Sequence, residues 1–151
     1  MRPYGMATRA APFDSFQVAD IGDVAVNPYN LLKTVDAIEA AVDGVLAAGA
    51  IPVSVGGDHT CTLPVLRSIA KVHGPVALIH IDAHADLRMA YQGFNHSHAS
   101  IMHNVMSLPR APKSLVQVGI RDFCQEEYDY IQSDDRIHTY FDRKNKERIF
   151  R

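Results

Sequence analysis

Three side chains that bind hard metal ions alternate with small alanines directly after an apolar run. The run covers residues 76–81, and Asp82, His84 and Asp86 follow it at every second position. Side chains two apart in an extended chain point to the same face. We therefore expect these three to converge just past the carboxyl end of a strand, where open α/β sheets place their ligands. The spacing predicts half of a metal site.

A second apolar run, residues 51–55, ends in Gly56-Gly57-Asp58-His59. If the two runs are neighbouring parallel strands, His59 joins the first three side chains at one edge of the sheet. Imidazole and carboxylate ligands without a thiolate suit Mn²⁺, Fe²⁺ or Zn²⁺. Taken alone, His59 is better explained as a loop residue at a helix start. A solvated turn is the alternative for the Asp/His/Asp set, but it accounts poorly for an aspartate that directly follows a buried strand. Together they favour a metal centre, and a mononuclear iron site is a further alternative.

The elements that must position these residues alternate along the chain. Asn27 and Pro28 are typical of a helix start, Thr60 is the predicted cap of the next helix, and residues 142–151 form a charged tail. We predict strands at residues 16–26, 51–55, 76–81, 114–120 and 136–141, and helices at residues 28–48, 63–72, 98–106 and 124–132. This order predicts a three-layer α/β/α domain with a mostly parallel sheet and helices on both faces.

The composition narrows the class of protein. A formal charge of −2 gives no reason to expect nucleic acid or a membrane surface as partner, and 47% hydrophobic residues suffice for a core. Cys61 and Cys124 stand far apart in no paired motif, as expected of reduced thiols. We expect a cytoplasmic protein, with a mitochondrial location as the alternative.

The two ligand-bearing motifs carry a family resemblance. Gly56-Gly57-Asp58-His59 followed by Asp82-Ala83-His84-Ala85-Asp86 resembles the arginase/agmatinase (ureohydrolase) family. Shorter matches stand at residues 20–23, 97–100 and 117–121. The resemblance extends over about residues 16–141 and implies an arginase-like fold.

The resemblance also implies the chemistry. It makes His59, Asp82, His84 and Asp86 ligands of two Mn²⁺ ions, with Asp82 bridging them and Asp86 also counted as catalytic. Hydroxide held by the ions would attack a guanidino carbon and release urea and an amine. By the same resemblance, His98 handles protons. Asp58 is expected to orient the His59 loop rather than bind metal, and His80 is expected to lie in the core or to support the ligands.

The sequence also departs from the family pattern. No Asp-x-Asp pair follows Arg121, although the family carries one after a later strand. We therefore expect residues 1–151 to form a single, incomplete ureohydrolase-like domain without the second half of its metal ligands. The preferred substrate is agmatine. Arginase or guanidino-acid activity is the alternative, as is a non-catalytic subunit that associates with full-length members of an oligomeric family. Arg88 is expected to pair with a metal-site carboxylate or with a substrate carboxylate.

Overall fold

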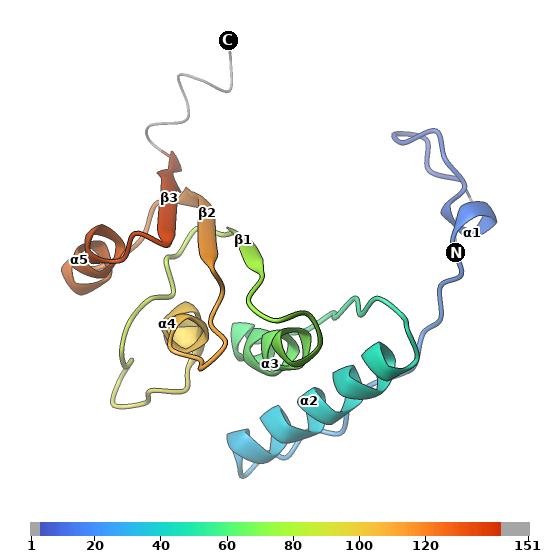
Figure 1. Cartoon of the computed structure of the whole chain (residues 1–151), viewed down its shortest axis with the longest axis horizontal. Coiled ribbons are helices and arrows are strands. Elements are labelled where there is room, and N and C mark those ends of the chain that lie inside the picture. Colours follow the sequence, from blue (N-terminus) through green and yellow to red (C-terminus); the bar gives the residue numbers. More distant parts are fainter. Residues whose placement is uncertain (1–3, 143–151) are drawn as a thin grey trace.

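A three-stranded parallel sheet forms the centre of the fold in a computed structural model that describes residues 4–142. The strands are β1 (Ala77–Ile81), β2 (Ser114–Ile120) and β3 (Ile137–Phe141), and β2 lies between the other two (Figure 1). Their positions match three of the predicted strands. The predicted α/β class with a parallel sheet is confirmed.

Three helices lie along one face of this sheet: α3 (Thr62–His73), α4 (Ile101–Met106) and α5 (Gln125–Ser133) (Figure 1). Their apolar side chains and those of the strands form one buried core. The core cluster consists of Leu63, Leu66, Ala85, Leu87, Ile101, Met102, Val105, Met106, Leu115, Ile120, Ile131 and Ile137. Ala85 and Leu87 belong to the segment after β1, so burial of apolar surface anchors the predicted ligand segment to the core.

Helix α2 (Leu31–Ala47) begins three residues later than expected. Its N-cap is Asn30, whose Oδ1 accepts a hydrogen bond of 3.2 Å from the backbone amide of Lys33. The prediction of Asn27 as the cap was wrong. Asn27 accepts instead from the amide of Tyr29 at 3.0 Å, which closes a turn before the helix and takes up the side-chain oxygen that a cap would use.

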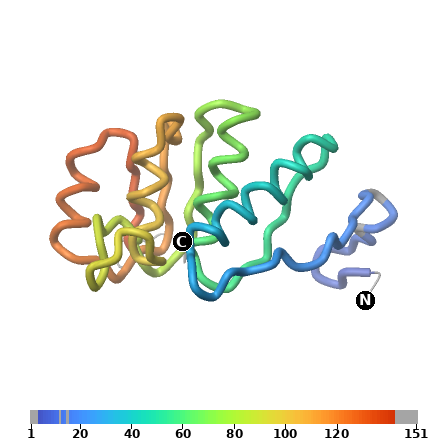
Figure 2. Tube along the Cα trace, turned by 90° about the horizontal axis from the view of Figure 1, so that it is seen from below, coloured from blue at the N-terminus to red at the C-terminus, as the bar shows by residue number. Residues whose placement is uncertain are grey.

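Helix α2 packs against the side of α3 that faces away from the sheet (Figure 2). Val35 and Val42 are its buried residues. Lys71 joins the two helices through Glu39 at 2.6 Å and Asp43 at 2.8 Å. The hydroxyl of the buried Ser68 donates to the carbonyl of Glu39 at 3.1 Å. Helix α2 is therefore held by α3 rather than by the sheet.

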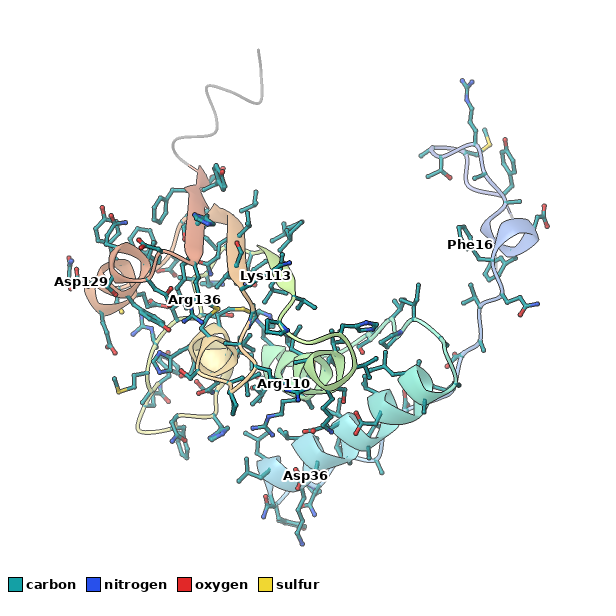
Figure 3. The ribbon with its side chains drawn as sticks, viewed as in Figure 1. Phe16, Asp36, Arg110, Lys113, Asp129 and Arg136 are labelled. Atoms are coloured by element: carbon teal, nitrogen blue, oxygen red, sulfur yellow. The ribbon has the colours of Figure 1, made fainter. Side chains whose placement is uncertain are left out.

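The predicted helix at residues 98–106 is a 3₁₀ turn, η2 (His98–Ser100), followed by α4. Arg110 lies in the connection from α4 to β2 and donates from Nη1 to the carbonyls of Ala70 at 3.4 Å and Lys71 at 3.3 Å (Figure 3). These carbonyls belong to the last turn of α3, where a cation is favoured by the helix dipole. The contact ties α3 to the chain that enters β2.

Two predicted strands do not form. Residues 16–26 and 51–55 have no regular structure, and Ile51, Val53 and Val55 are 88%, 87% and 96% exposed. A strand needs a neighbour for its backbone N–H and C=O groups, and within residues 4–142 β1 pairs with β2 alone. Both segments carry the apolar residues of a strand, but among the described residues no strand lies beside either of them.

The face of the sheet opposite the helices carries apolar side chains exposed to solvent. Ile79 lies beside Val116, and Ile81 lies beside Val118, which in turn lies beside Tyr140. Ile79 and Ile81 are 68% and 80% exposed. We call these five residues the uncovered face. Exposed apolar patches of this kind mark sites of association.

The charged tail and the membrane-spanning potential of the helices complete the description of the chain. The charged tail lies outside the described residues from residue 143 onward. In the part of the chain that the structure describes, no helix has the length and apolar character needed to cross a membrane.

Candidate metal centre

Four side chains converge at the carboxyl end of β1. They are His59, His80, Asp82 and Asp86, and one donor atom from each lies within 4.8 Å of the others. His59 Nδ1 lies 2.6 Å from Asp86 Oδ2 and 3.9 Å from Asp82 Oδ2. Imidazole and carboxylate donors at this separation fit a divalent cation such as Mn²⁺.

His59 is positioned by the short turn η1 (His59–Cys61) that precedes α3. Asp58 is its N-cap, and Asp58 Oδ1 accepts a hydrogen bond of 2.8 Å from the amide of Thr60. The prediction of Thr60 as the cap of the next helix was wrong, because Thr60 lies inside η1 and the N-cap of α3 is Cys61, without a side-chain hydrogen bond. Asp58 thus supports the His59 turn, as expected.

Asp86 reaches His59 because its backbone leaves the extended conformation. Its φ is +53°, a left-handed conformation that is uncommon outside glycine. The Asp86 carbonyl accepts hydrogen bonds from the amides of Met102 at 2.9 Å and His103 at 3.3 Å. The first turn of α4 therefore holds this conformation, as expected where strain occurs at a functional site.

The two oxygens of Asp82 face different partners. Oδ1 accepts from the amide of His84 at 2.9 Å and lies 3.3 Å from His84 Nδ1. Oδ2 lies 3.4 Å from His80 Nε2 and faces His59. Asp82 thus stands between His84 on one side and His59 and His80 on the other.

His84 lies outside the group of four. Its side chain is 59% exposed, and its Nε2 lies 3.8 Å from Asp122 Oδ2. The structure therefore brings together three of the four predicted ligands, His59, Asp82 and Asp86. It leaves His84 on the far side of Asp82.

The surroundings of Asp82 favour its ionised carboxylate, which is the form that binds metal. Burial acts to raise the pKa of Asp82, but hydrogen bonds from the His84 and Ala83 amides and the charge of His80 outweigh it, so the pKa is lowered. Burial lowers the pKa of His80 and favours neutral imidazole. The hydrogen bond to Asp86 raises the pKa of His59, so a cation would have to compete with a proton for this imidazole. The carboxylates of Asp82 and Asp86 thus lie close to the imidazoles of His59 and His80.

His98 lines the same cavity, of about 580 Å³, as Asp82 and Asp86. Its Nδ1 lies 3.6 Å from Asp58 Oδ2, and its ring lies edge-on to Tyr91 with centroids 5.6 Å apart. The predicted proton-handling residue is therefore placed beside the candidate ligands. Tyr91 was not anticipated from the sequence.

Arg88 pairs with a residue that the sequence did not single out. Its Nε lies 3.6 Å from Glu127 Oε2, and its guanidinium lies 5.5 Å from the centroid of the Tyr91 ring. Glu127 is 3% exposed and accepts from the amides of Leu87 at 3.0 Å and Cys124 at 2.8 Å. In the structure, Arg88 thus pairs with a supporting carboxylate rather than with a metal-site carboxylate. The sequence signal for the role of Glu127 is its position three residues after the N-cap Cys124, as in a capping box.

Comparison with known proteins gives a consistent result. A sequence model described as the arginase family matches residues 1–150. The guanidinobutyrase of Pseudomonas aeruginosa is 48% identical over 122 residues, which are 80% of this chain and 38% of that protein. The mitochondrial agmatinase of Gallus gallus is 49% identical over 86 residues, which are 57% of this chain and 25% of that protein. The chain thus spans well under half the length of either curated relative.

The fold has solved counterparts. A putative agmatinase from Clostridium difficile superimposes with a TM-score of 0.84 at 21% identity. The match covers 99% of this chain and 54% of that structure. The arrangement of helices around the parallel sheet is therefore that of a larger, known domain.

Proposed function

The chain belongs to the arginase family, and we propose that it carries the metal-binding part of a ureohydrolase that converts a guanidino group to urea and an amine. The observation that supports this most is the group of His59, His80, Asp82 and Asp86 at the carboxyl end of β1. Its members come from the two motifs on which the family resemblance depends and from the strand between them. The proposed metal is manganese, with two ions in the complete site.

Each residue has a distinct part in this proposal. Manganese, when bound, supplies Lewis acidity and a water of lowered pKa near neutral pH. Asp82, Asp86 and His59 would hold one cation, and His84 would contribute to holding the second. His98 moves a proton to the departing amine through Nε2, because its Nδ1 faces Asp58.

The lining of the cavity bears on the substrate. Apart from Asp82 and Asp86, which are assigned to the metal, it contains Asp58 and Asp122, whereas its arginine, Arg88, is already paired with Glu127. An acidic wall attracts a substrate with a cationic far end more strongly than one with a carboxylate. We therefore place agmatine first. A guanidino acid is the alternative, which the similarity to guanidinobutyrase supports.

Urea release in the presence of Mn²⁺ tests the proposal. Agmatine, arginine and 4-guanidinobutyrate are compared on the wild-type chain, on Asp82→Ala and on Asp129→Ala. Asp129 is exposed on α5, away from the sheet, and is the matched control (Figure 3). Any urea that the chain releases should come chiefly from agmatine, with loss in Asp82→Ala and no change in Asp129→Ala. Equal rates in both variants would contradict the assignment of the site.

A non-catalytic subunit is the second candidate, because the uncovered face offers an apolar surface for association. The chain would then bind a full-length member of the family without turnover of its own. The absence of urea from all three substrates, in a sample shown to be folded, would support this candidate over the first. Co-elution with the P. aeruginosa guanidinobutyrase in size-exclusion chromatography would test it directly.

A further inference from the structure

The Nε2 atom of His80 is buried and lacks a hydrogen-bond partner of good geometry, although it lies in the candidate metal centre. The residue is 6% exposed, and Nε2 is 3.4 Å from Asp82 Oδ2. A buried polar atom of this kind needs an explanation. Either Nε2 offers a lone pair to a metal, or it carries a proton that is directed at Asp82.

The side chain of Gln117 decides between these two arrangements. Gln117 is fully buried in β2, and its Nε2 lies 2.8 Å from the carbonyl oxygen of Ala85 and 3.0 Å from His80 Nδ1. A backbone carbonyl can only accept hydrogen bonds. The NH₂ end of Gln117 must therefore face Ala85 and His80, and its Oε1 accepts from Thr139 Oγ1 at 2.9 Å.

This orientation fixes the tautomer of His80. Because the Gln117 amide donates to Nδ1, Nδ1 must present its lone pair. In a neutral imidazole the proton is then on Nε2. A protonated Nε2 has no lone pair for a metal ion. The hydrogen-bond chain runs from Thr139 on β3, through Gln117 on β2, to His80 on β1, whose Nε2 lies 3.4 Å from Asp82 Oδ2.

We propose that His80 is a positioning residue, whose Nε2–H orients Oδ2 of the metal-binding carboxylate of Asp82, and that it is not a metal ligand. The Asp82 carboxylate is then held at both oxygens, by His80 at Oδ2 and by the His84 amide at Oδ1. Residues that orient ligands in this way typically change metal affinity about 10–100-fold when they are removed. The effect on metal binding rests on the proposed function, whereas the tautomer does not.

The first experiment needs no variant and no metal. Long-range ¹H–¹⁵N correlation spectra of the ¹⁵N-labelled, metal-free chain report which ring nitrogen of each neutral histidine carries the proton. We expect the Nε2–H form for His80. The Nδ1–H form would overturn the proposal, whether or not the chain binds metal or has activity.

The second experiment measures Mn²⁺ affinity by isothermal titration calorimetry. His80→Leu removes the donor, whereas His80→Gln keeps an N–H near the position of Nε2. We expect about 10–100-fold weaker binding for His80→Leu, with most of the affinity restored in His80→Gln. His138→Leu, at an exposed position on β3, is the control that should leave affinity unchanged. Equal losses in both His80 variants would mean that the imidazole itself binds the ion and would refute the positioning role. If wild-type chain binds no Mn²⁺, the proposed function fails and the tautomer spectrum alone decides.

Discussion

Replacement of the buried Glu127 by alanine should destabilise the chain severely. The Glu127 carboxylate accepts hydrogen bonds from the amides of Leu87 at 3.0 Å and Cys124 at 2.8 Å. Each hydrogen bond to a charged group contributes roughly 1.5–3 kcal/mol. Leu87 is 1% exposed, so its amide would be left buried without a partner, whereas water can reach the Cys124 end more easily. We therefore expect a loss of about 3–5 kcal/mol in the free energy of unfolding.

Urea denaturation followed by circular dichroism measures this loss. Glu126→Ala is the matched control, because it removes the same charge from the same turn of α5 at an exposed position. It should change the free energy of unfolding by no more than about 0.5 kcal/mol. A loss below about 1 kcal/mol in Glu127→Ala would refute the reasoning, since the buried hydrogen bond from the Leu87 amide to the carboxylate is alone worth roughly 1.5–3 kcal/mol.

Three further predictions concern charge, metal and surface. The hydrogen bonds from Arg136 lower the pKa of Asp134 from 3.8, so its contribution to stability is present above that pH and is lost as the pH falls through the lowered value. Asp134→Asn should therefore cost stability at pH 7 and much less at pH 2, which urea denaturation at both pH values checks. Mn²⁺ at 100 times its dissociation constant should stabilise the fold by about 2.7 kcal/mol, and a thermal melt of Asp82→Asn should show little of this gain. Replacing Ile79 and Ile81 by lysine should reduce self-association in light scattering while leaving the melting temperature nearly unchanged, because both side chains are exposed.

The sheet could be predicted where sequence neighbours are also spatial neighbours. β1, β2 and β3 follow one another in the chain and in the sheet, so each apolar run meets its partner after one helical connection. Residues 51–55 show the same apolar character, yet they remain irregular. A strand depends on backbone groups from another segment, and local pattern does not report whether that segment lies beside it.

The candidate site was predictable in its residue types but not in its geometry. Alternation placed Asp82, His84 and Asp86 on one face, whereas the left-handed backbone of Asp86 turns its carboxylate toward His59. That conformation depends on amides of α4, which lie more than ten residues later in the chain. Gln117 and Glu127 come from still farther along, and their roles depend on contacts that no local spacing encodes.

The position of β1 at the rim of the sheet links assembly to chemistry. β1 ends in Asp82, and within residues 4–142 its second edge has no strand beside it. Parallel strands lie about 4.8 Å apart, so a strand beside β1 would end next to the metal centre. A polypeptide that extended the sheet in parallel at this rim would deliver its own terminal side chains to the coordination sphere. Addition of a strand beside β1 would then also complete the metal site, and the affinity for metal would increase when the partner binds.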